Sequence, residues 1–471
     1  MIKNEETLVN IEKDPLIKRG RKLLLELIAT GIQAADPFKA VQKHVKLEGR
    51  TIRIATKWER DISSFENIII VGAGKASAKM ALALEKILGE ENITKGLVNV
   101  PSETVSNLTG TSKIRFHPAG HPVATKASLE GTKEIIKLIS GLTRNDLVIC
   151  VISGGGSAML ELPIAGITLN HFSTVFNLLT QKGATIYELN AFRKHLSQVK
   201  GGRLAKIARP AEVVSLIISD VVGDDLSTIA SGPTTPDKTS WHDLMTIMKK
   251  YALTAALPQT VIQLIEKGVK RELAETLRAT DPVFMRVHNF LIASNTLSCH
   301  AIKQAALGKG FTARIVSTTL TGEARLVGEK LAEELLHSEK NNVLIAGGET
   351  TVTITGKGIG GRNQELALAA ATHLSNKEGI FFAAVGSDGK DGPTDAAGAI
   401  IDYQTILKGV KKGLRAETFL LDNNSYAFLK ETNSLILTGP TGTNVSDLFL
   451  GVHLARKAEQ KSSRIYFQSF K

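Results

Sequence analysis

The stretch NIIIVGAGKASAKMALALE, residues 67–85, decides the fold because it joins a strand pattern to a helix pattern through a glycine turn. The β-branched run Ile68–Val71 is typical of a buried strand, and the apolar spacing over Ala76–Leu88 predicts a helix. A glycine turn between a strand and a helix exposes backbone N–H groups and the positive helix end, which together suit an anion. Lys75 adds a cation at this end, where cations are otherwise disfavoured, so the pattern favours a bound anion.

This turn matches neither of the two common nucleotide-binding motifs. A Walker A loop needs G-x-x-x-x-G-K-[ST], but Ile69 replaces its first glycine and an alanine replaces its hydroxyl residue. A dinucleotide fingerprint needs a third glycine where Ser77 stands, and no acidic residue clearly ends a second strand about twenty residues later. We therefore expect Gly72, Gly74 and Lys75 to bind phosphate in a third way.

Short β-branched runs alternate with helical segments beyond this stretch, which predicts an α/β fold with a mostly parallel sheet and helices on both faces. A helical pattern with a basic face precedes them at residues 16–45. The polar stretch 267–282 separates two sets of strands, and 471 residues are too many for one ordinary core. We therefore predict two α/β domains, residues 1–285 and 286–471. The predicted strands are Ile68–Val71, Gly96–Val100, Leu147–Ile152, Val213–Ser219, Phe290–Ala293, Ala313–Ser317, Val343–Ala346, Thr350–Ile354, Ile380–Val385 and Ser434–Leu437.

Two more loops in the first half follow predicted strands. The first reads SGGGS, and it is no nucleophile elbow because Met159 stands where the last glycine of G-x-S-x-G belongs. Three glycines between hydroxyls suit an anion nest, although a plain turn is the alternative. In the second loop Asp220 ends a strand, where open α/β sheets bind ligands and where a carboxylate suits Mg²⁺. The predicted nest consists of Ser153, Gly154, Gly155, Gly156 and Ser157.

Three loops in the second half have the same character. Arg362 starts a helical run after three glycines, and its guanidinium could clamp a phosphoryl or carboxylate group. Asp388, Asp391 and Asp395 follow another strand in GSDGKDGPTDAAG, which fails the EF-hand pattern at two ligand positions. Turn formation is nearly as good an interpretation for Asp391 as function. The stretch LILTGPTGTNVSDLFLG, residues 435–451, is expected to join a strand to a helix. Six such loops together indicate phosphate binding.

The composition excludes several other classes of protein. The formal net charge is +12, but the basic residues are scattered and aromatic residues make up only 5%, so we favour small anions and predict no nucleic-acid partner. No apolar run reaches the length of a membrane span and the first residues lack a signal-peptide pattern, so we predict no membrane partner and a cytoplasmic location. Cys150 and Cys299 alone make neither a metal cage nor a disulfide framework.

Seven stretches between Val71 and Leu448 resemble, in the same order, the glycerate 2-kinases that carry a MOFRL domain. The resemblance implies a Rossmann-like N-terminal domain, a C-terminal α/β MOFRL domain and an active site in the cleft between them. It also implies ATP-dependent phosphorylation of D-glycerate at its 2-hydroxyl, giving 2-phosphoglycerate. The matching stretches are VGAGKASAKMA, HPAGHPVAT, VISGGGSAMLELP, SDVVGDDLSTIASGPTTPD, GGETTVTITGKGIGGRNQELALAAA, GSDGKDGPTDAAGAIID and TGPTGTNVSDL.

The resemblance also implies roles for residues. Lys75 and Arg362 fall on residues held to be essential for catalysis, and Asn363 would join them in binding phosphate. Asp388 would hold Mg²⁺ or accept the hydroxyl proton, and the expected metal ligands are Asp220, Asp388 and Asp395. The carboxylate of glycerate would lie on the SGGGS nest. Two alternatives stay open, a hydroxypyruvate reductase using NAD(P)H and a non-enzymatic protein that binds sugar acids or nucleotides. The sequence leaves the oligomeric state undecided, with a homodimer as one candidate.

Overall fold

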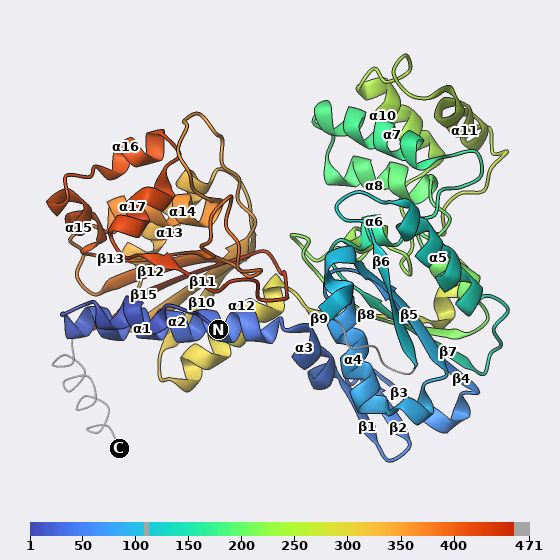
Figure 1. Ribbon diagram of the computed structural model, residues 1–471, viewed down its shortest axis with the longest axis horizontal. Coiled ribbons are helices and arrows are strands. Elements are labelled where there is room, and N and C mark those ends of the chain that lie inside the picture. The colour runs from blue at the N-terminus through green and yellow to red at the C-terminus, as the bar shows by residue number, and fades with distance from the viewer. Residues whose placement is uncertain (108–112, 456–471) are drawn as a thin grey trace, which may run out of the picture. The chain divides into compact units, whose positions relative to one another are not determined.

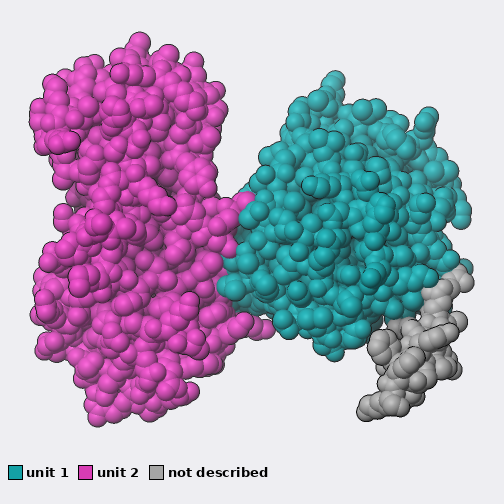
Figure 2. All heavy atoms as spheres, turned by 180° about the vertical axis from the view of Figure 1, so that it is seen from behind, with its two compact units in different colours: residues 1–36, 294–471 teal, residues 37–293 magenta. Residues whose placement is uncertain are grey.

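The computed structural model describes residues 1–107 and 113–455, and it divides the chain into two compact units (Figures 1 and 2). Unit 1 combines Met1–Asp36 with Ser294–Lys471, and unit 2 is Pro37–Ala293. This division differs from the predicted boundary at residue 285, because the first 36 residues belong to the same unit as the C-terminal half. The C-terminal residues 456–471, for which the sequence predicts no role, lie outside the described residues.

The main sheet of unit 2 has six strands in the order β6-β5-β4-β7-β8-β9, and every pair is parallel. The predicted parallel sheet is therefore confirmed, and its central strands are buried along almost their whole length, as expected where helices cover both faces. Its last strand is the predicted strand at Phe290–Ala293, which belongs to this sheet and not to the second set. The strands are β4 (Asn67–Ala73), β5 (Lys95–Pro101), β6 (Ile114–Ala119), β7 (Asp146–Ile152), β8 (Glu212–Ile218) and β9 (Val287–Ala293).

Two smaller parts complete unit 2. A three-stranded antiparallel sheet is formed by β1 (Val45–Glu48), β2 (Thr51–Ile54) and β3 (Trp58–Asp61). A helical layer has its own apolar core, in which Phe192, Trp241 and Ile265 are buried. The helices of unit 2 are α3 (Pro37–His44), α4 (Ser77–Leu88), α5 (Lys126–Ile139), α6 (Gly156–Met159), α7 (Leu169–Gln181), α8 (Ile186–His195), α9 (Arg203–Ala208), α10 (Trp241–Lys250) and α11 (Gln259–Val269).

Unit 1 is a mixed six-stranded sheet between two layers of helices (Figure 1). Successive residues of one strand face opposite cores: Phe381 packs with α1, α2 and α12, whereas Phe382 packs with α13 and α14. The sheet order is β10-β11-β15-β12-β13-β14, and only the first pair is parallel. The elements are α1 (Glu5–Asn10), α2 (Pro15–Ala34), α12 (Asn295–Gly308), β10 (Thr312–Leu320), α13 (Ala324–Leu336), β11 (Asn342–Gly348), α14 (Arg362–Leu374), β12 (Ile380–Gly386), β13 (Gly398–Asp402), α15 (Thr405–Lys411), α16 (Ala416–Leu421), α17 (Ser425–Glu431), β14 (Leu435–Ile436) and β15 (Asp447–His453).

Three predictions for unit 1 need correction. The expected helix after TGPTGTNVS is strand β15, which pairs antiparallel with β11 on one side and β12 on the other. The predicted strand Thr350–Ile354 is a loop with a single bridge between Thr351 and Glu323. The third prediction placed the N-terminal segment in the first domain, but Met1–Asp36 belongs to unit 1, because the apolar face of α2 is buried against β12 and β15.

Candidate functional site

Lys75 lies in unit 2, in the turn between β4 and α4. Its backbone N–H donates to the carbonyl of Gly154 at 3.0 Å, so the two glycine loops that follow β4 and β7 are paired. The Lys75 side chain is exposed and forms no ion pair with any carboxylate of the described residues. Burial and the Lys75 ammonium lower the pKa of His121, which places this histidine near the lysine. The ammonium is therefore accessible to an anionic ligand.

Two of the predicted phosphate-binding residues of unit 2 make contacts that hold the fold together. Gly72 is inside strand β4, where it pairs with Val98 on one side and Val151 on the other, so its backbone belongs to the sheet. Ser153 is 1% exposed, and its hydroxyl accepts a hydrogen bond from the backbone N–H of Ala76 at 3.0 Å. A serine hydroxyl thus satisfies one N–H group at the start of α4 that was expected to face an anion.

The rest of the SGGGS loop is more accessible. Gly154, Gly155 and Ser157 are half-buried, whereas Gly156 is buried at the start of α6. A Cβ atom on Gly154 would lie 1.9 Å from Oδ2 of Asp220, so the carboxylate lies against the loop and would have to shift for a larger residue. The structure thereby brings together two predicted features, the loop after β7 and the aspartate after β8. Gly74 is constrained more strongly, because its φ is +142° and a Cβ atom there would lie 2.7 Å from the backbone carbonyl oxygen of Ser153.

Arg362 is the first residue of α14 in unit 1, and it lines a cavity of about 670 Å³. Its Nε lies 2.7 Å from Oδ2 of Asp447, its Nη2 donates to Oδ1 of Asp447 at 3.0 Å, and its Nη1 donates to Oε1 of Glu349 at 2.6 Å. Burial alone would lower the pKa of Arg362, but these two carboxylates raise it. A guanidinium has five N–H donors, of which these contacts use three, so two remain for a ligand.

Asp447 and Glu349 are residues that sequence reasoning missed. Asp447 is completely buried at the start of β15, and burial raises its pKa to about 7 even though Arg362 opposes this shift. Arg362 therefore opposes the protonation that burial favours at this carboxyl. Because a helix was expected at this position, the contact between Asp447 and Arg362 was not predicted. The only signal available was that both acids lie inside the quoted stretches GGETTVT and TGTNVSDL.

The three aspartates of the GSDGKDGPTD loop have different surroundings. Asp388 is half-buried and lines the same cavity as Arg362. Asp391 is 2% exposed and its carboxylate accepts four hydrogen bonds from the backbone and side-chain amides of Asn363 and Gln364, so it caps α14. Asp395 is exposed, accepts a hydrogen bond from the Tyr426 hydroxyl at 2.9 Å and does not line the cavity.

Asn363, which was predicted to bind phosphate, lies inside the protein. It is completely buried, and its side-chain amide donates to Asp391 at 3.2 Å and to Asp447 at 3.1 Å. Both donors of the amide are thereby used inside the protein. Asn363 thus connects the cap of α14 to the carboxylate that holds Arg362, and its amide oxygen accepts no hydrogen bond from the described residues.

The described residues contain no cluster of three or more histidine, cysteine, aspartate or glutamate side chains suited to a metal ion. Of the predicted ligands, Asp220 lies in unit 2, while Asp388 and Asp395 lie in unit 1. Mg²⁺ commonly takes only one or two carboxylates together with phosphate oxygens of a substrate. In unit 1, Asp388, half-buried in the cavity, fits such a donor set, and in unit 2 the residue to consider is Asp220, which lies against the glycine loop. Asp395 does not fit, because it lies outside the cavity and is bonded to Tyr426.

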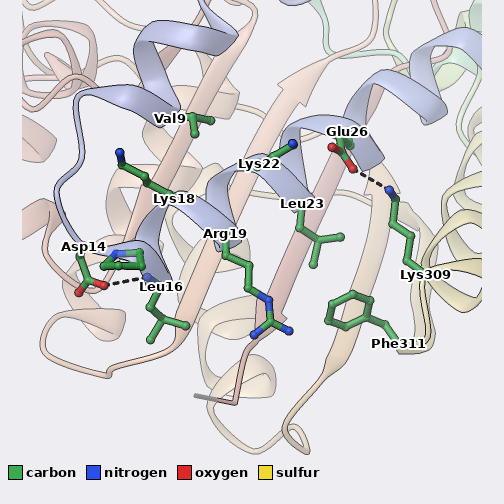
Figure 3. A pocket seen from close by; sticks show the side chains of 11 residues that line it. Val9, Asp14, Leu16, Lys18, Arg19, Lys22, Leu23, Glu26, Lys309 and Phe311 are labelled. Atoms are coloured by element: carbon green, nitrogen blue, oxygen red, sulfur yellow. Dashed lines mark hydrogen bonds and ion pairs between the residues drawn. The ribbon is translucent and has the colours of Figure 1, made fainter. Parts of the chain in front are cut away.

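A larger cavity of about 930 Å³ lies elsewhere on unit 1 and includes none of the predicted site residues (Figure 3). Figure 3 shows that residues of α2, among them Lys18 and Arg19, line it together with Phe311. Its walls are mostly apolar carbon, and the ion pair between Glu26 and Lys309 at 2.6 Å lies at its edge. Size alone therefore does not identify the site, and the cavity at Arg362 has the chemistry that the loops predict.

Comparisons with known proteins match both halves of the chain. Residues 23–266 match a family described as a domain of unknown function, DUF4147, and residues 342–447 match the MOFRL family. A glycerate 2-kinase from Pyrococcus horikoshii is 42% identical, covering 93% of this chain and 98% of that protein. A crystal structure of glycerate kinase from Thermotoga maritima superposes with a TM-score of 0.81 at 37% identity, covering 92% of this chain and 99% of that one. A protein from Agrobacterium vitis that bears the name "Putative hydroxypyruvate reductase" is 39% identical, covering 81% of this chain and 97% of that protein.

Proposed function

The chain belongs to the glycerate 2-kinase family with a MOFRL domain, and from this premise we propose that it transfers a phosphoryl group from ATP to the 2-hydroxyl of D-glycerate. The products are 2-phosphoglycerate and ADP. The observation that carries the proposal is the fixed guanidinium of Arg362, which retains two N–H donors and lines a cavity of about 670 Å³. A cavity of this size lies within the range of roughly 300–1,000 Å³ that is typical of sites for ligands as large as a nucleotide.

Phosphoryl transfer needs little covalent help from the protein and much positioning and positive charge. Arg362 supplies that charge in a preset orientation, because Asp447 and Glu349 fix its planar fork before any ligand arrives. Lys75 supplies a second, mobile ammonium from the turn at the start of α4. We assign both cations to charge that develops on the transferred phosphoryl group, and Gly74, Gly154 and Gly155 to backbone contacts with phosphate oxygens.

Mg²⁺ is part of the proposal. When bound, it would neutralise phosphate charge and orient the triphosphate. Asp388 is the residue of unit 1 that would hold it, since its half-buried carboxylate lines the cavity and no ion pair occupies it within the described residues. Asp220 is the corresponding candidate in unit 2. The alternative role for Asp388 is to accept the proton of the 2-hydroxyl, for which a positioned carboxylate is also suited.

We also propose that the enzyme acts in the cytoplasm on small molecules, with a homodimer as the assembly to be tested by sedimentation. No helix in the described part of the chain is both long and apolar enough to cross a bilayer. The basic residues are scattered along the sequence and aromatic residues make up only 5%, which favours small anions over nucleic acid as partners.

The experiment that tests the function is incubation of the purified protein with ATP, Mg²⁺ and D-glycerate, followed by identification of the phosphoglycerate isomer by phosphorus NMR. We expect 2-phosphoglycerate. Formation of 3-phosphoglycerate would contradict the proposed position of transfer. Oxidation of NADH in the presence of hydroxypyruvate would support the reductase alternative, and binding of ATP and glycerate without turnover would support a non-enzymatic role.

A further inference from the structure

A small cavity of about 240 Å³ lies inside unit 2, next to the loop that follows β7. Residues 122–124, the end of the SGGGS loop, helix α7 and Arg193 of α8 line it. Ser157 therefore belongs both to this wall and to the loop that is hydrogen-bonded to the backbone of Lys75. The volume is below the range of roughly 300–1,000 Å³ that drug-sized ligands occupy, so the cavity suits a molecule of only a few carbon atoms.

Arg193 gives this cavity a cation that the protein does not neutralise by a close ion pair. Its guanidinium carbon lies 4.8 Å from the ring centroid of Phe176, and its Nη1 makes only a long hydrogen bond, 3.4 Å, to Oδ1 of Asn190. No carboxylate of the described residues lies within ion-pair distance of it. Burial lowers the pKa of Arg193, and the nearby Glu161 opposes this effect. A half-buried guanidinium in a cavity, without a paired carboxylate, favours a bound anion.

Glu161 adds a hydrogen-bond acceptor to the same cavity. It is 2% exposed, and its Oε2 lies 3.2 Å from the ammonium of Lys200, which also donates to the carbonyl of Ser157 at 2.9 Å. Its other oxygen, Oε1, is buried and accepts no hydrogen bond of normal geometry from the described residues. Buried acceptors are nearly always satisfied in folded proteins, so an unsatisfied one at a cavity points to a donor supplied by a ligand.

We propose that this cavity binds D-glycerate, with Arg193 holding its carboxylate and Oε1 of Glu161 accepting a hydrogen bond from one of its hydroxyls. A three-carbon hydroxy acid offers both groups within a small volume, which matches the cation, the acceptor and the size of the cavity. This proposal rests on the kinase function proposed above. The sequence had suggested that the carboxylate of glycerate binds at the SGGGS nest. The proposal assigns this carboxylate to Arg193 because Ser153 is buried and its hydroxyl already accepts a hydrogen bond from Ala76.

The first test is Arg193→Met, which removes the charge but keeps much of the side-chain length. We expect the KM for D-glycerate to rise by about 10- to 100-fold, the usual effect of losing a hydrogen-bonded charge, while the KM for ATP stays at the parent value. Arg115→Met is the matched control, since Arg115 is an exposed arginine of the same unit that pairs with Glu134. The control should leave both constants unchanged.

The second test avoids any buried residue. Asn177 is an exposed residue of α7 that lines the cavity, and Asn177→Asp adds a negative charge there with almost no change of shape. Asn170→Asp adds the same charge to an exposed position near the start of the same helix, and Asn170 does not line the cavity. We expect a raised KM for D-glycerate in Asn177→Asp and the parent value in Asn170→Asp.

Calorimetric titration of D-glycerate into each protein, without ATP, separates this inference from the function itself. Weaker binding in Arg193→Met and Asn177→Asp, with parent binding in both controls, supports the site. If the parent enzyme makes 2-phosphoglycerate but both folded variants keep the parent KM and affinity, glycerate binds elsewhere and only this inference fails. If the parent protein makes no phosphoglycerate, the proposed function fails, whatever the titrations show.

Discussion

Arg362→Lys tests the proposed catalytic role of the Arg362 guanidinium most directly, because the substitution keeps the positive charge and removes the planar fork. In the parent, the fork contacts both oxygens of Asp447 at 2.7 and 3.0 Å and one oxygen of Glu349 at 2.6 Å. A lysine has its three donors on one nitrogen and cannot hold both carboxylates and a ligand in the same geometry. We expect the folded variant to lose about 100- to 1,000-fold in turnover, as when one electrostatic donor is removed from an active site.

The same substitution should also lower the stability of unit 1. Removing one partner of a fully buried ion pair costs about 3–5 kcal/mol. Asp447 is fully buried, but the side chain of Arg362 is 33% exposed and lysine retains one charged contact. We therefore expect a smaller loss in the free energy of unfolding, about 1–2 kcal/mol. A variant that unfolds at the assay temperature would lose activity for this reason alone, so melting must be measured beside turnover.

Arg325→Lys is the matched control. Arg325 donates to Glu365 of the same helix α14 at 2.5 Å, the arginine is partly exposed and its partner is buried, as in the Arg362–Asp447 pair. The control should lose similar stability while keeping its turnover of ATP and D-glycerate, measured as 2-phosphoglycerate formed. If folded Arg362→Lys keeps most of its turnover, or if Arg325→Lys loses as much, the catalytic role assigned to Arg362 is wrong.

Three further predictions concern the other charged groups. Lys75→Ala should lower turnover by about 100- to 1,000-fold with little change in the KM for ATP, and steady-state kinetics of the double variant with Arg362→Lys should show a loss well short of the product of the single losses. Asp388→Asn should raise the Mg²⁺ concentration needed for half-maximal turnover or abolish turnover, whereas Asp395→Asn should keep the parent Mg²⁺ titration. Burial alone would raise the pKa of Glu212, but hydrogen bonds from neighbouring side chains lower it from 4.5 to about 2, so Glu212→Gln should cost about 3 kcal/mol at pH 7. Because the native pKa is depressed, this difference should be complete above pH 4.5 and shrink as the pH falls toward 2, as measured by urea unfolding.

The parallel sheet of unit 2 could be predicted because its central strands are buried β-branched runs that end in glycine turns. The predicted runs Ile68–Val71 and Leu147–Ile152 lie inside β4 and β7. Strand β6 was missed because its sequence, IRFHPA, has no such run and contains a proline, which is tolerated at a sheet edge. Local pattern therefore identified the central strands and the edge strand β9 of this sheet, but not the other edge strand, β6.

Unit 1 was harder to predict because its elements depend on distant partners. The sequence DLFLGVH of β15 is a short apolar run, which periodicity alone cannot assign to a helix or a strand. Its two strand partners, β11 and β12, decide the outcome. The helix α2 was predicted, but an amphipathic pattern does not predict which hydrophobic core the helix will cover. The two-unit fold was thus predictable, and the membership of the first 36 residues was not.

Candidate catalytic groups were predictable where a residue type stands at an unusual place, as with cations at the starts of α4 and α14. The partners of those groups could not be predicted. Asp447 lies 85 residues beyond Arg362 in the chain, and the two residues meet because strand β15 pairs with β11 in the sheet. Spacing in sequence carries no information about such a contact. The buried carboxylate nevertheless determines the orientation of the guanidinium, so the structure supplies the part of the site that makes it preorganised.

The aspartates of the GSDGKDGPTD loop show why residue type cannot assign a metal ligand. Each oxygen of Asp391 already accepts two hydrogen bonds from the first residues of α14, and a cation placed there would face N–H groups that point at it. Asp388 differs because its Oδ1 accepts a single hydrogen bond, 3.0 Å, from the backbone of Lys390, and its carboxylate still lines the cavity. The difference between a helix cap and a metal ligand therefore depends on how many donors the fold has already directed at the carboxylate. This is a property of the packed chain, because the donors to Asp391 come from residues 363 and 364, on a different element.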